Sequence, residues 1–177
     1  MGLWRLIVMK KIEKIIDVAL YNFGTWLTKN DWRGKEHDCV NTFAHAFLMD
    51  LITPKGPLHH AAQICIECGI AQPEGYTNLH ARRDLVVWSE PFHNTWGQDR
   101  KRVHTPIALM EWKTHHKDRL PSRLFYPHDE EWFTKYTSIT PDVVGFVTAV
   151  YFLPSGPKVY WKKSHAGIFS DVQSSFL

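Results

Sequence analysis

The sequence predicts a mixed α/β fold of the α+β kind, in which helices flank a central mixed β-sheet. Apolar residues recur at helical spacing in the first third of the chain, whereas β-branched and aromatic residues form compact runs in the middle and the last third. One acidic, helix-like segment interrupts these runs. A chain that contains both helix-like and strand-like hydrophobic patterns favours a sheet whose faces are covered by helices.

Four segments carry a helical pattern. The first runs from Leu6 to about Lys29, and the second runs from roughly Lys35 to Ile52, where the Pro- and Gly-containing residues 53–57 stop it. A third, shorter helix is predicted from Leu58 to about Gly69. A fourth is predicted from His128 to Thr137, with an acidic start.

Four strands are predicted, over residues 84–88, 106–113, 143–153 and 158–162. The third of these is too continuous in apolar character to have a solvated face, so it is expected at the centre of the sheet. Residues 154–157 form the turn into the last strand.

Length and composition predict a single domain over residues 1–177, with an N-terminal helix over 1–30, a core over 34–163 and a tail over 164–177. The chain is 44% hydrophobic and 14% aromatic, which is far too much core-forming material for a disordered protein. No segment has the pattern of a membrane span or of a secretory leader, and three cysteines are too few for a disulfide framework. A cytoplasmic location is therefore expected, without a membrane partner.

The positive charge is concentrated in the middle of the chain. Between His80 and Arg123 there are nine Lys or Arg against five Asp or Glu, while the whole chain has a formal net charge of only +3. A basic centre on a nearly neutral background favours a polyanionic partner, nucleic acid first. A solvated loop is the alternative explanation for such a run of charges.

Asp84, Glu111 and Lys113 are the main candidates for chemistry. Side chains alternate along a strand, so Glu111 and Lys113 share one face of the strand predicted over residues 106–113. If this strand pairs with the one that Asp84 opens, two carboxylates converge beside an ammonium group, and carboxylate oxygens suit Mg²⁺. A buried ion pair between neighbouring strands is the alternative.

Glu36 is a fourth candidate, because it ends the apolar stripe of the second predicted helix. An acid in the first turn of a helix also interacts favourably with the helix dipole and needs no further role.

Three segments together form a recognisable motif: an inward Glu36 on a leading helix, then Arg-Arg-Asp84-Leu-Val-Val, then Ile-Ala-Leu-Met-Glu111-Trp-Lys113. With the helix and the hydrophobic strand that follow, they resemble the PD-(D/E)xK nuclease superfamily, which has a restriction-endonuclease-like fold. The resemblance covers about residues 36–151. The chain departs from it in having Arg83 where the motif has Pro, and in a long connection over residues 89–105.

The resemblance implies a Mg²⁺-dependent deoxyribonuclease, an endonuclease more than an exonuclease, in which Mn²⁺ substitutes for Mg²⁺. Asp84, Glu111 and the main-chain carbonyl of Trp112 would hold the metal ion, Lys113 would assist the attacking water, and Glu36 would act through a metal-bound water or a second ion. DNA is the expected partner, and a homodimer is left open. The expected phosphate contacts are Arg82, Arg100, Lys101, Arg102 and Lys117.

Three alternatives remain at this point, one of which is a small-molecule or protein-binding domain whose basic loop is merely solvated. A non-catalytic nucleic-acid-binding or assembly protein could keep the same fold. The sequence also contains half the ligands of a zinc site, Cys65 and Cys68, with His59 and His60 before them. Two cysteines that are simply buried in the core explain the cysteine pair better.

Overall fold

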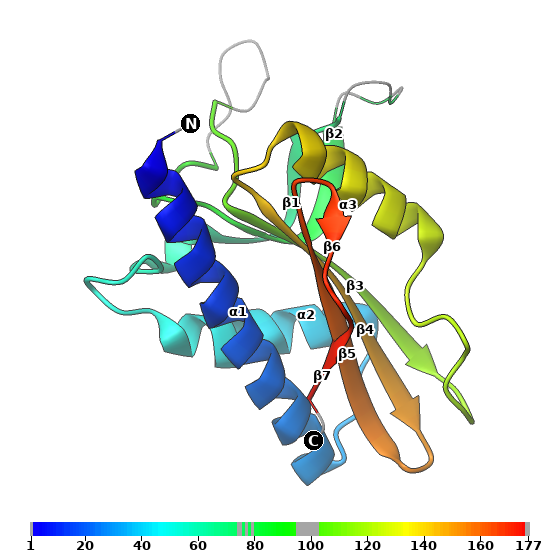
Figure 1. Cartoon of the computed structure of the whole chain (residues 1–177). Helices are drawn as coiled ribbons and strands as arrows, with labels where there is room; N and C mark the ends of the chain where they lie inside the picture. Colours follow the sequence, from blue (N-terminus) through cyan, green and yellow to red (C-terminus); the bar gives the residue numbers. More distant parts are fainter. Residues whose placement is uncertain (1, 74–75, 77, 79, 95–102, 176–177) are drawn as a thin grey trace.

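The computed structural model describes residues 2–73, 76, 78, 80–94 and 103–175. Over these residues the chain forms a seven-stranded mixed sheet flanked by helices, which confirms the predicted fold class (Figure 1). The helices are α1 (Leu3–Asn30), α2 (Glu36–Thr42) and α3 (Pro127–Ile139). None of the helices in the described ranges combines the length and the apolar character that a membrane span needs.

The strands are β1 (Ile64–Ala71), β2 (His80–Val87), β3 (Ala108–His116), β4 (Val144–Leu153), β5 (Gly156–His165), β6 (Ile168–Phe169) and β7 (Gln173–Ser174). They lie in the order β1-β2-β3-β4-β5-β6, and β7 pairs with β5. Only β3 and β4 are parallel among these pairs. A parallel pair needs a long crossover, and α3 provides it.

The sheet has a hydrophobic core on each face. On one face, Phe23 of α1 and Phe43 pack around Trp112 of β3; on the other, Trp132 and Phe133 of α3 pack over the sheet. Every residue of β4 is buried. The prediction of a central strand over residues 143–153 is therefore confirmed, because β4 has a core on each side.

One predicted helix is wrong. The segment from Leu58 to Gly69 contains a short 3₁₀ turn over Ala61–Gln63, and its residues from Ile64 onward belong to strand β1. β1 pairs with β2 from Ile64↔Val87 to Ala71↔His80, and this ladder outweighs a local pattern that is short and mixed. The second predicted helix is helical to Leu51, but it changes to a π-helix over Phe43–Leu48 and to a 3₁₀ turn over Met49–Leu51.

A cluster of charged side chains fastens α1 to β5. Lys163 Nζ lies 3.0 Å from Glu13 Oε1 and 2.8 Å from Asp17 Oδ2, and His165 Nε2 lies 3.1 Å from Glu13 Oε2. Burial alone would raise the pKa of Glu13, but the hydrogen bonds and positive charges of His165 and Lys163 lower this pKa to about 2.

We predict that Glu13→Gln lowers the free energy of unfolding at pH 7 by roughly 1.5–3 kcal/mol, the range for hydrogen bonds to charged groups. The folded pKa of Glu13 is depressed, so its contribution is present above about pH 4.5 and is lost as the pH falls toward 2. Urea unfolding at pH 7 and at pH 3 should therefore show a smaller difference between wild type and variant at pH 3. Asp50→Asn, at an exposed position, is the control. Equal unfolding midpoints for wild type and Glu13→Gln at pH 7 would contradict the prediction.

Candidate active site

The sheet opens between β2 and β3. These strands pair only from Val87↔Ala108 to Leu85↔Met110. Two residues beyond Met110 on β3, the N–H of Trp112 donates to Oδ2 of Asp84 at 2.7 Å. The Asp84 carboxylate thus accepts the hydrogen bond that a backbone carbonyl of the neighbouring strand would accept in a regular ladder, and the two strands separate at this point.

The backbone of β2 is irregular at Asp84. Leu85 and Val87 belong to the core under α1, whereas Ala81 belongs to the core under α3, although strict alternation would put all three on one face. β1 changes faces at the matching position, where Glu67 has a φ of +51° between the pairs Ile66↔Leu85 and Cys68↔Arg83. This shared irregularity is a bulge-like feature of the kind often found where a strand redirects a side chain.

The irregularity turns Arg83 inward. Its guanidinium carbon lies 3.7 Å from the centre of the Trp132 ring on α3, and its Nη1 donates to Oε2 of Glu111 at 2.8 Å. Arg82, one of the expected phosphate contacts, has a largely exposed side chain, and its Nη1 lies 3.6 Å from Oε2 of Glu67. Alternation along a regular strand does not predict the inward position of Arg83, and the sequence offers no signal of the irregularity.

Three of the predicted residues meet at the ammonium group of Lys113. Its Nζ lies 2.9 Å from Glu111 Oε1 and 3.5 Å from Glu36 Oε1, and it donates to the carbonyl oxygen of Trp112 at 2.8 Å. Burial would lower the pKa of Lys113, but the charge and hydrogen bond of Glu111, followed by the charges of Glu36 and Asp84, raise it above its ordinary value. Lys113 is therefore a permanent cation near neutral pH.

Asp84 titrates far from the usual range of an aspartate. Burial and then the negative charge of Glu111 raise its pKa to about 7, against the lowering effect of the Trp112 N–H and of Lys113. Burial and Glu111 also raise the pKa of Asp129, a buried acid in the first turn of α3. Burial is the larger cause of both pKa shifts, and the negative charge of Glu111 adds to each.

The site holds more acids than bases. Among the described residues, four carboxylates gather here with two cations, so that two negative charges are left when all are ionised; these groups are Glu36, Asp84, Glu111, Asp129, Arg83 and Lys113. Asp129 lines a small cavity with Glu111 and Lys113. The sequence predicts an acidic start for this helix, but no sequence pattern connects Asp129 with the site.

The remaining predicted residues lie elsewhere. Lys117 follows the end of β3, six residues beyond Glu111, which corresponds to roughly 20 Å of extended strand. It lines a different cavity with His115 and Tyr126. The expected phosphate contacts Arg100, Lys101 and Arg102 lie outside the described residues. Of the proposed thiol pair on β1, Cys68 is buried and Cys65 is partly exposed.

The donor set suits a hard cation. In the described ranges no three Asp, Glu, His or Cys side chains are grouped closely enough to share one metal ion. Mg²⁺ does not require such a group, because proteins usually hold it through one or two carboxylates while it keeps several waters. Asp84, Glu111 and the carbonyl of Trp112 present only oxygen atoms, and they fit this ion in type and in charge.

Comparisons of the chain with protein-family models, with curated proteins and with solved structures gave no match. The function must therefore be inferred from the site itself.

We predict that, without divalent cations, Asp84→Asn raises the free energy of unfolding at pH 8 by roughly 1–3 kcal/mol. The folded pKa of Asp84 is raised from 3.8 to about 7, so the stability that its protonated form contributes is complete below about pH 3.8 and is lost as the pH rises through 7. Asn has the same shape, and its side-chain oxygen can still accept the Trp112 N–H.

Urea unfolding in EDTA at pH 5 and pH 8 measures this effect, with exposed Asp118→Asn as the matched control. The advantage of Asp84→Asn should shrink at pH 5. A variant less stable than wild type at pH 8 would show that the site requires the charged carboxylate.

Proposed function

We propose that this protein is a metal-dependent nuclease that hydrolyses DNA phosphodiester bonds, with Asp84, Glu111 and Lys113 at its centre and Glu36 in support. One observation carries the proposal. Carboxylate oxygens of Glu111 and Glu36 and the carbonyl oxygen of Trp112 converge on Lys113 Nζ, beside the half-buried carboxylate of Asp84. Acids and a lysine so arranged can bind a metal ion and a phosphate together.

Asp84 and Glu111 would hold Mg²⁺ or Mn²⁺ with the carbonyl of Trp112. The two uncompensated negative charges of the site match the charge of a divalent ion. The raised pKa of Asp84 supports this assignment, because a cation next to two mutually repelling carboxylates would favour their ionised forms. When bound, the ion would polarise a phosphodiester oxygen and lower the pKa of a coordinated water.

Lys113 would act as a fixed positive charge. Its raised pKa makes it a poor proton acceptor, so we assign it the stabilisation of negative charge on the phosphate, or the orientation of water, and not general base catalysis. The side chain of Glu36 is 40% exposed and lies at the first residue of α2. From there it can accept a hydrogen bond from a water at the open side of the site.

Membership of the PD-(D/E)xK superfamily is part of the proposal. The order α2, β2, β3, α3, β4 agrees with the expected order of helix, two strands, helix and strand, with β1 added after α2. Asp84 lies on β2, and Glu111 and Lys113 lie on β3. The local excess of positive charge between His80 and Arg123 supports DNA as the substrate.

A second candidate is a non-catalytic nucleic-acid-binding or assembly protein in which these charges serve the fold. The position of Arg83 favours it. This arginine is buried, pairs with Glu111 and stacks on Trp132, so it links β2, β3 and α3 as a structural ion pair would.

We predict that the protein cleaves DNA with Mg²⁺ or Mn²⁺ and not in EDTA, and that Glu111→Gln and Lys113→Met each reduce the cleavage rate about 100-fold or more. Gel assays on linear, circular and branched DNA and on RNA measure the activity and its substrate class. Glu131→Gln and Lys29→Met, both at exposed positions, are the matched controls and should cleave like wild type. Circular dichroism of each variant excludes misfolding as the cause.

The same assays separate the two candidates. Salt-dependent DNA binding without cleavage by wild type would support the non-catalytic protein. Cleavage by Glu111→Gln and Lys113→Met at the wild-type rate would remove this site from the mechanism.

A further inference from the structure

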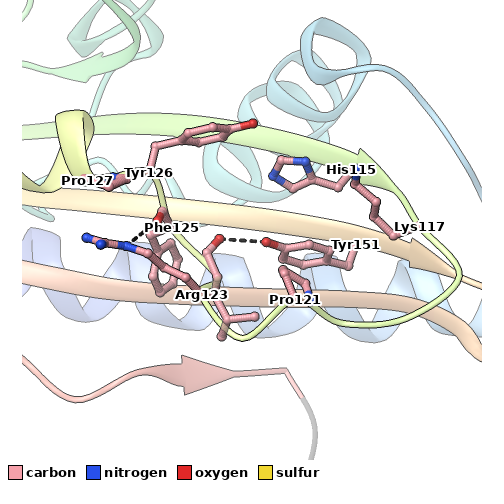
Figure 2. Close-up of a pocket in the computed structure, with 9 residues that line it drawn as sticks. His115, Lys117, Pro121, Arg123, Phe125, Tyr126, Pro127 and Tyr151 are labelled. Atoms are coloured by element: carbon pink, nitrogen blue, oxygen red, sulfur yellow. Dashed lines mark hydrogen bonds between the residues drawn. The ribbon is translucent and has the colours of Figure 1, made fainter.

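A cavity of about 280 Å³ lies beyond the end of β3, against the segment that leads into α3 (Figure 2). Four aromatic side chains line it, those of His115, Phe125, Tyr126 and Tyr151, and two cationic side chains, Lys117 and Arg123, lie beside them. The cleavage mechanism proposed above does not use this cavity.

The rings offer stacking surfaces that are already held in place. His115 stacks on Tyr151 with 4.7 Å between ring centres and 24° between planes, and Tyr126 lies 5.8 Å from His115. The hydroxyl of Tyr151 donates to the carbonyl of Leu124 at 2.8 Å, which fixes that ring (Figure 2). Tyr126 is 49% exposed, so much of its ring is open to a ligand.

Positive charge surrounds the rings. Arg123 and Lys162 both pair with Glu130, so this group of three keeps one positive charge in excess. Lys117 is exposed and forms no ion pair with any described residue. An apolar cavity beside a net positive charge suits a ligand with a flat ring and a negative group, and this is the chemistry of a nucleotide.

The cavity adjoins the proposed cleavage site. His115 is two residues beyond Lys113 and lies on the same face of β3, which is a separation of about 7 Å along the strand. A smaller cavity lined by Glu111, Lys113 and Asp129 shares Leu124, Phe125 and Tyr126 with this one. A strand whose phosphate lay at Lys113 could therefore place its neighbouring base against Tyr126.

We propose that this cavity binds one unpaired nucleobase of a DNA single strand, stacked on Tyr126 and His115, with Lys117 and Arg123 against the flanking phosphates. The inference rests on the proposed function for the position of the scissile phosphate. The volume is near the lower limit of small-molecule sites, about 300 Å³, which suits one base and not a base pair. A base in a duplex would have to leave its stack at a cost, so the cavity favours single strands, flaps or frayed ends.

The test measures binding without cleavage. Fluorescence anisotropy in EDTA compares a fluorescein-labelled dT₁₂ single strand with the dT₁₂·dA₁₂ duplex. Wild type should bind the single strand at least about fivefold more tightly, and Tyr126→Ala should weaken single-strand binding about tenfold, the scale of losing one stacked base. Tyr126→Phe should retain binding. Tyr21→Ala removes a similarly exposed tyrosine from α1 and should have no effect.

A single 2-aminopurine in the strand adds a direct readout, since stacking on a ring quenches its fluorescence. Quenching by wild type and by Tyr126→Phe, but not by Tyr126→Ala, would support the proposal. Equal affinity for duplex and single strand, or identical behaviour of Tyr126→Ala and Tyr21→Ala, would overturn it. Ring-dependent binding in a protein that never cleaves with Mg²⁺ would support the cavity and reject the nuclease, so the two proposals fail separately.

Discussion

The hydrogen bond from the Trp112 N–H to the Asp84 carboxylate lies where β2 and β3 stop pairing, and the arrangement of the site follows from it. A regular ladder would continue past Met110 with backbone acceptors, and the sheet would stay closed. With a side chain as the acceptor, the strands diverge. Glu111 and Lys113 then extend from β3 into the opening, where Arg83 and Glu36 meet them.

The opening would be costly without its pattern of charges. Buried carboxylates are tolerated when cations and hydrogen bonds compensate them, and Arg83 and Lys113 do this for the two oxygens of Glu111. The compensation is incomplete, because Asp84 and Asp129 both hold their protons more tightly than ordinary acids. A fold that needed only an ion pair between strands would gain nothing from these two extra acids. A divalent ion would neutralise the excess, so the energetics of the site and the proposed chemistry point the same way.

Much of the fold could be predicted, because α1, α3 and β4 have long and consistent hydrophobic patterns. The apolar residues that define these patterns are largely the ones buried in the structure. The shared face of Glu111 and Lys113 follows from alternation on a regular strand.

Strand β1 was predicted as a helix because its eight residues, which include two cysteines and a glycine, have no clear hydrophobic period. Its extended conformation is determined by pairing with β2. The role of Arg83 was hidden for a different reason. The change of face at Asp84 goes with a left-handed conformation at Glu67 on the neighbouring strand, and a glutamate gives no local sign of it. Asp129 reaches the site because α3 packs on the face of the sheet that carries Glu111 and Lys113, and this arrangement depends on tertiary contacts with β4 and β5.

The central claim is that the oxygens at the opening between β2 and β3 form a site for a divalent cation. Crystals grown with Mn²⁺ and measured at a wavelength where manganese scatters anomalously test it most directly. We expect an anomalous peak at about 2.0–2.3 Å from carboxylate oxygens of both Asp84 and Glu111, with Lys113 moved off Glu111, and no such peak in Glu111→Gln crystals. Well-ordered crystals in which Mn²⁺ is absent from this opening, while Arg83 and Lys113 still hold Glu111, would contradict the account.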